Sequence, residues 1–151
     1  MRNIWFILLT IVLLCSACHE RVVYTTFYSQ PLEGWHQDSA LTYTAEIADS
    51  TALYDMLIVV RHNGEYPYQN LWLFVDVQKD SILLRRDTIE SYLANERGEW
   101  YGSGMSKYTL PLLYMENIAL PAGEYKITVQ QGMREEQLRG ITDVGLKVIN
   151  N

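Results

Sequence analysis

The segment Tyr125-Lys126-Ile127-Thr128-Val129-Gln130 shows most clearly how this chain folds. Its aromatic and aliphatic residues alternate with Lys126, Thr128 and Gln130, and a period of two is that of a β-strand with one buried and one exposed face. Pro121-Ala122-Gly123, just before the segment, predicts a turn. The segment therefore predicts a strand that lies half-exposed in a sheet.

Similar runs recur along the rest of the chain, separated by loop and turn signals. We expect further strands in residues 21–28, 41–46, 54–62, 71–77, 81–89, 110–120 and 141–149, with Asn63-Gly64 and Lys79-Asp80 as turns and 30–39 as a loop. Short strands at this spacing predict an all-β fold, a single β-sandwich of the immunoglobulin-like or jelly-roll type.

Three segments carry more particular expectations. Residues 71–77 are apolar on both faces, which predicts a central strand whose second side is also covered. Residues 110–120 contain Pro111, which has no backbone N–H to donate and therefore predicts an edge strand or a bulged one. Residues 91–96 have the composition of a short helical turn.

The first residues have the pattern of an export signal. Arg2 is the only charged side chain before Glu20, and residues 4–14 are apolar apart from Thr10. A helix of that length rises about 16 Å, roughly half of a ~30 Å hydrocarbon core, so a spanning helix is disfavoured and cleavage is favoured.

The small residues Ser16 and Ala17 precede Cys18, which resembles the cleavage and lipidation site of a bacterial lipoprotein. We therefore expect a lipoprotein signal peptide in residues 1–17, lipidated Cys18 with the first strand region in 18–30, and the sandwich domain in 21–151. An uncleaved anchor or an ordinary secretory signal are the alternatives. Acyl chains on Cys18 would hold the mature protein at a membrane.

Composition excludes some classes of partner. The chain has 18 acidic and 12 basic side chains and a net charge of −6, so it offers no basic stripe to neutralise phosphates, and we expect no nucleic acid partner. Its two cysteines, Cys15 and Cys18, both lie in the export region. The domain that follows must therefore be stabilised by core packing without a disulfide.

Short motifs follow one another through the whole domain. They are Arg61-His62, Tyr66-Pro67, Asn70-Leu71-Trp72, Asp87-Thr88-Ile89-Glu90, Leu93-Ala94, Gly98-Glu99-Trp100, Gly102-Ser103-Gly104, Gly123-Glu124-Tyr125, Met133-Arg134, Leu138 and Gly140-Ile141-Thr142-Asp143-Val144-Gly145-Leu146. No single motif is specific, but in this order and spacing they resemble the GldH family of gliding motility-associated lipoproteins.

The resemblance implies a lipid-anchored envelope protein, on the outer membrane or its periplasmic face, that belongs to gliding motility and through it to the type IX secretion machinery. It implies no enzymatic activity and no cofactor. The residues agree, because no Gly-x-Ser-x-Gly motif is present and His19, His36 and His62 are scattered, so no catalytic or metal site is predicted. We therefore expect a non-catalytic interaction component with envelope protein partners.

Aromatic side chains are the candidate interaction residues. Trp100, Tyr101, Trp72 and Trp35 offer large rigid faces that could stack on a partner protein or on a sugar ring, with core packing as the alternative. Trp100 lies among glycines and is expected to be the most exposed tryptophan.

The matching motifs contain three charged residues that we interpret as structural: Arg61, Arg134 and Asp143. A charge pair that joins two strands would explain why these residues are charged. A carbohydrate-binding sandwich lipoprotein remains the alternative function, with a glycan as its ligand. An aromatic row in a groove flanked by Asp or Asn would favour a glycan, and a flat apolar patch would favour a protein.

Lipidation at Cys18 is directly testable by metabolic labelling of cells with a fatty-acid analogue. Cys18→Ala should abolish the label because no other residue then occupies the acceptor position after Ser16 and Ala17. Cys15→Ala is the matched control and should leave labelling unchanged, since the large Leu14 precedes it. Label that survives Cys18→Ala would contradict the assignment.

Overall fold

The computed structural model describes residues 21–151, and all the regular structure in that range is β-strand. None of its segments forms a helix with the length and apolarity that crossing a bilayer requires. The signal peptide and Cys18 predicted above lie outside the described residues. The strands are β1 (Arg21–Ser29), β2 (Trp35–His36), β3 (Leu41–Ile47), β4 (Leu53–Asn63), β5 (Asn70–Lys79), β6 (Ile82–Tyr92), β7 (Lys107–Ala119), β8 (Gly123–Gln131), β9 (Gln137–Leu138) and β10 (Ile141–Asn150).

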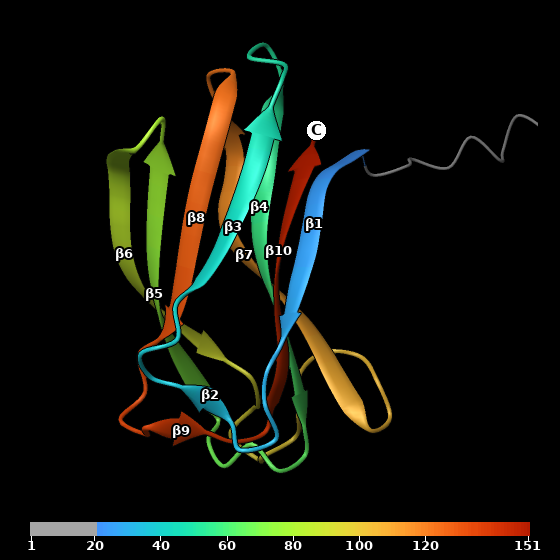
Figure 1. Ribbon diagram of the computed structural model, residues 1–151. Coiled ribbons are helices and arrows are strands. Elements are labelled where there is room, and N and C mark those ends of the chain that lie inside the picture. Colours follow the sequence, from blue (N-terminus) through green and yellow to red (C-terminus); the bar gives the residue numbers. More distant parts are fainter. Residues whose placement is uncertain (1–20) are drawn as a thin grey trace, which may run out of the picture.

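These strands form two four-stranded antiparallel sheets that pack face to face (Figure 1). The first sheet has the order β1-β10-β4-β7 and the second has the order β3-β8-β5-β6, while the short strands β2 and β9 pair with each other. The prediction of an all-β sandwich is confirmed. β8, whose sequence gave the clearest alternation, is a central strand between β3 and β5.

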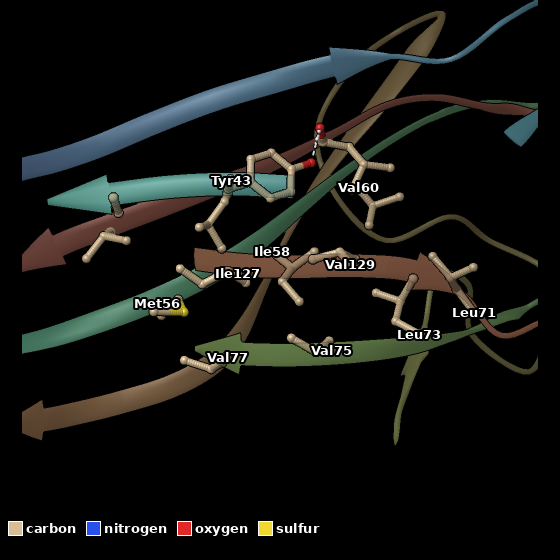
Figure 2. Close-up of a cluster of buried hydrophobic side chains, with 14 of the residues drawn as sticks. Tyr43, Met56, Ile58, Val60, Leu71, Leu73, Val75, Val77, Ile127 and Val129 are labelled. Atoms are coloured by element: carbon tan, nitrogen blue, oxygen red, sulfur yellow. Dashed lines mark hydrogen bonds between the residues drawn. The ribbon is translucent and has the colours of Figure 1, made fainter. Parts of the chain in front are cut away.

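The core lies between the inner faces of the two sheets (Figure 2). Each aliphatic side chain that is fully removed from water there stabilises the fold by about 1.5–3 kcal/mol. The contributors from β4, β5 and β8 include Met56, Ile58, Val60, Leu73, Val75, Val77, Ile127 and Val129.

One polar link crosses this apolar layer. Tyr43 of β3 is fully buried, and its hydroxyl donates a hydrogen bond of 2.8 Å to the carbonyl oxygen of Val144 in β10, drawn dashed in Figure 2. A buried hydroxyl without a partner would be costly, so this bond favours one relative placement of the two sheets.

Two of the three particular expectations need correction. β5 is central, as predicted, but its second face is not covered: Trp72 is 37% exposed and Phe74 is 46% exposed. Residues 91–96 form no helical turn, because the Asn95 side chain accepts hydrogen bonds from the backbone N–H groups of Arg97 and Glu99 and fixes an irregular turn instead. The expectation for Pro111 is confirmed, since β7 is an edge strand and its pairing with β4 is bulged.

The loops 30–40, 64–69, 93–106 and 132–140 gather at one end of the sandwich, which also holds β2 and β9 (Figure 1). We call it the distal end, because it lies opposite the start of β1. Gly140 joins two of these loops: its φ is +87°, and a Cβ built on it would lie 2.4 Å from the backbone nitrogen of Tyr66. Only glycine fits this conformation and this close approach.

Gly140→Ala should destabilise the domain by about 1–3 kcal/mol, because the added methyl group meets backbone atoms that cannot move aside and φ stays positive. Gly64→Ala is the matched control, since a Cβ there meets nothing within 4 Å. It should change stability by less than about 0.5 kcal/mol. Urea denaturation of the chain from residue 19 onward measures both, and equal effects of the two substitutions would contradict the packing described.

Candidate functional site

Three aromatic rings gather at the distal end around His62, the next-to-last residue of β4. The His62 ring stacks on Tyr108 of β7 with centroids 5.3 Å apart, meets the edge of Trp100 at 4.6 Å, and lies 6.1 Å from Tyr66. The backbone bridge between Ala94 and Trp100 holds the tryptophan in this place. The motifs Arg61-His62, Tyr66-Pro67 and Gly98-Glu99-Trp100, which are far apart in the sequence, therefore meet in one cluster.

Within this cluster His62 is fully buried. Its Nδ1 lies 3.0 Å from the carbonyl oxygen of Asn63, while its Nε2 has no hydrogen-bond partner among residues 21–151. Burial lowers the pKa of His62 and outweighs the opposite effect of the Asn63 carbonyl, so the imidazole is neutral at pH 7. It serves as an aromatic packing surface.

The tryptophans do not share one environment. Trp100 is only partly exposed and packs against the core, so the prediction that it is the most exposed tryptophan was wrong, and among the tryptophans of residues 21–151 Trp72 is the most exposed. Trp35 is fully buried, with its indole N–H donating to the Ser39 carbonyl at 2.8 Å, so it is a core residue and not part of an interaction surface. Tyr101, next to Trp100, is 45% exposed.

Asp143 is the centre of a polar network at the same end. It accepts hydrogen bonds from the hydroxyls of Ser29 at 2.8 Å and Thr142 at 2.9 Å, and Lys107 Nζ lies 3.8 Å from its Oδ2. Burial raises the pKa of the Asp143 carboxyl, but these hydrogen bonds and the charges of Lys107 and Arg61 outweigh burial and hold the pKa below its usual value. Residues from β1, β10 and β7 are thereby joined.

The three predicted polar residues are only partly brought together. Arg61 pairs with Asp143 in the ladder between β4 and β10, but its guanidinium lies 3.9 Å from the centroid of the Phe27 ring as a cation–π contact. The expected charge pair between strands is thus made by Lys107 with Asp143. Arg134 lies elsewhere, beside Trp72, where both line a depression of about 370 Å³.

A larger depression of about 720 Å³ opens over the Asp143 network. Leu32, which lines this depression, is 100% exposed. Met105, which is 99% exposed, directly precedes the lining residue Ser106 in the sequence. Neither was singled out from the sequence, where an isolated apolar residue in a loop looks the same whether it is buried or exposed. The charged lining residues are Glu33, Glu65, Lys107, Arg139 and Asp143.

Metal coordination has no evident place in this arrangement. Across residues 21–151, no three His, Cys, Asp or Glu side chains gather as possible metal ligands. What the distal end offers is a surface of exposed apolar side chains around a charged hollow, which is suited to binding.

Asp143→Asn should destabilise the domain by about 1–2 kcal/mol at pH 7, because the buried carboxylate accepts charge-assisted hydrogen bonds. Since the pKa of Asp143 is lowered on folding, its contribution is fully present above the unfolded pKa of about 3.9 and is lost as the pH falls through the folded pKa. Urea denaturation of both proteins at pH 7 and at pH 3 should show the difference shrink at the lower pH. A difference that grows on acidification would contradict the network.

Comparisons with known proteins give matches that extend along the whole domain. The GldH lipoprotein family model matches residues 22–148. The gliding motility lipoprotein GldH homolog of Christiangramia forsetii is 34% identical over 152 residues, covering 95% of this chain and 93% of that protein. The gliding motility lipoprotein GldH of Flavobacterium johnsoniae is 33% identical over 154 residues, covering 97% of this chain and 96% of its own length.

Among solved structures, the VP2 subviral particle of infectious bursal disease virus aligns with a TM-score of 0.40 and 14% identity, over 87% of this chain and 32% of the viral chain. Because the family model and both relatives span nearly all of the described residues, this chain belongs to the GldH lipoprotein family.

Proposed function

We propose that this protein is a lipid-anchored component of the gliding motility and type IX secretion machinery that acts by binding an envelope protein through its distal end. The family assignment supports the setting, since both relatives are named as gliding motility lipoproteins. The single observation that carries the binding role is the exposure of large apolar side chains at the distal end.

Leu32 and Met105 stand almost wholly in solvent beside the hollow above Asp143, and Tyr101 is exposed on the same end. Single exposed apolar residues are ordinary on protein surfaces. Here, however, Leu32 lines a charged concavity, and Met105 directly precedes another of its lining residues, Ser106. Apolar anchors with a polar surround are the usual arrangement of a protein–protein interface. A partner that covers these side chains would remove them from water.

The position of the predicted lipid anchor supports the same orientation. Cys18 lies three residues before the start of β1, and three residues span at most about 10 Å, so a lipid on Cys18 would keep the start of β1 close to the membrane surface. β1 has 9 residues and a length of about 30 Å, and it runs from that start to the distal end. Anchoring at Cys18 would therefore present Leu32, Tyr101 and Met105 away from the bilayer.

Leu32→Ala, Tyr101→Ala and Met105→Ala, tested singly, should identify a partner contact at the distal end. An anchor residue at an interface typically contributes ~2 kcal/mol or more, so at least one variant should lower partner capture about thirtyfold. The measurement is quantitative mass spectrometry of proteins captured with the tagged lipoprotein from crosslinked cells. Trp100→Ala is unsuitable, because Trp100 also packs on buried His62.

Leu113→Ala is the matched control, since Leu113 is an exposed aliphatic residue on the outer side of β7. It should leave capture and gliding unchanged. If none of the three distal variants lowers capture more than Leu113→Ala does, the distal end is not the binding surface and the proposal fails.

A further inference from the structure

Two aromatic side chains lie next to each other on the outer face of the second sheet, on the side away from the core. Trp72 and Phe74 lie on the same face of β5, while the residues between and beside them, Leu71, Leu73 and Val75, are fully buried. β5 is hydrogen-bonded to β8 on one side and to β6 on the other, so the two rings lie on a central strand and not at an edge of the sheet. Within residues 21–151 no segment covers them.

Gly132, which follows β8, lies against both side chains. A Cβ on Gly132 would lie 3.2 Å from Cζ of Phe74 and 3.3 Å from Cβ of Trp72, so both side chains rest against this position. The backbone N–H of Gly132 also donates to the Trp72 carbonyl oxygen at 2.7 Å. Residues two apart in a strand are separated by about 7 Å, so neighbouring rings of one pyranose chain can reach both side chains.

Hollows adjoin the pair at both ends. The first, of about 370 Å³, lies beside Trp72 and includes Asn70, Met133 and Arg134. The second, of about 380 Å³, lies beside Phe74 and includes Asp76 and Thr88. The aromatic row is thus flanked by Asn70 at one end and by Asp76 at the other.

Hydroxyl and amide groups and one ion pair surround Phe74. In the sheet register Phe74 lies between Thr88 and Gln130, and the next outward residue, Asp76, lies between Arg86 and Thr128. Arg86 cancels the charge of Asp76 through two hydrogen bonds, of 2.8 Å from Nε and 2.7 Å from the second guanidinium nitrogen.

Several of these groups are free to bind a ligand. The hydroxyls of Thr88 and Thr128 make no hydrogen bond to any group in residues 21–151, and Arg134 has no ion-pair partner in that range. Hydroxyl, amide and guanidinium groups around an aromatic surface match the chemistry of a sugar. A pyranose with equatorial substituents has flat C–H faces, which stack on aromatic rings, and a rim of hydroxyls, which need hydrogen-bond partners.

A protein partner would fit this face less well. Interfaces concentrate their affinity in a desolvated apolar centre. Here the apolar area is only two rings wide. Threonine, glutamine, the carboxylate of Glu90 and the Asp76–Arg86 pair border it on the neighbouring strands. An extended β-linked chain, in contrast, can lie along β5 and use the rings and the polar groups together.

We propose that Trp72 and Phe74, with Thr88, Thr128, Asn70 and Arg134 around them, form a binding site for an unbranched β-1,4-linked glycan. This site goes beyond the proposed function and is distinct from the depression over Asp143, because neither hollow shares a lining residue with that depression, although Gly132, Met133 and Arg134 belong to a loop of the distal end. One domain would thus hold a protein partner at its distal end and a glycan on its outer face.

The test is isothermal titration calorimetry of the full-length protein in detergent with β-1,4-linked hexasaccharides of glucose, xylose, mannose and N-acetylglucosamine. At least one should bind, and the α-1,4-linked glucose hexamer should bind at least tenfold more weakly than the best of them, because its bent chain does not present successive flat faces. Trp72→Ala should weaken the best binder at least tenfold, and Phe74→Ala at least threefold. Absence of binding by all four β-linked hexamers would overturn the proposal.

Two further variants keep the result interpretable if an alanine variant fails to fold. Thr88→Val and Thr128→Val remove only the hydroxyl from a β-branched side chain, and together they should weaken binding severalfold with an unchanged thermal midpoint. Tyr101→Ala is the matched aromatic control and should leave glycan binding intact.

The same variants separate this proposal from the proposed function. If Tyr101→Ala does not lower partner capture, this result counts only against binding at the distal end. If Trp72→Ala does not lower glycan binding, this result overturns only the glycan site on the outer face. If Trp72→Ala removes a captured protein or a self-association of the chain, and no hexasaccharide binds, the outer face is a protein surface and the glycan proposal is wrong.

Discussion

Contact between the inner faces of the two sheets is the interaction on which the whole structure depends. Residues 21–151 contain no cysteine, so no disulfide holds the sheets together, and the apolar layer between β4, β10, β5 and β8 must do so alone. Apolar contact alone does not fix how the two sheets lie relative to each other, and the hydrogen bond from Tyr43 to Val144 favours one relative placement. With both sheets fixed, their four distal loops meet, and close approaches such as that of Gly140 to Tyr66 hold them in one arrangement.

Much of this architecture follows from local sequence patterns, because strand period and turn chemistry are local properties. The alternation in β8 and the proline in β7 each predicted the right environment. The apolar residues on both faces of β5 predict that both faces are covered, and this is wrong for one face, because Trp72 and Phe74 are exposed to solvent. A strand pattern shows that a face is apolar, but whether anything lies over it depends on segments distant in the sequence.

The candidate site shows the same limit. The sequence makes both Trp35 and Trp72 candidate interaction residues, yet Trp35 is enclosed by the core and Trp72 lies on the outside of a sheet. Asp143 was expected to join strands through a charge, and the partner proved to be Lys107, which no motif indicated. The exposed Leu32 and Met105 gave no local signal at all, because loop residues lack a period from which burial could be predicted.

The central claim is that the distal end contacts an envelope protein, and site-specific photocrosslinking in living cells tests it most directly. A photoreactive amino acid placed at position 101, in a chain that otherwise keeps its sequence, should give a discrete adduct with a single envelope protein, because Tyr101 is exposed at that end. The same amino acid at position 113, on the outer side of β7, should give none. An adduct at position 113 with none at position 101 would contradict the account.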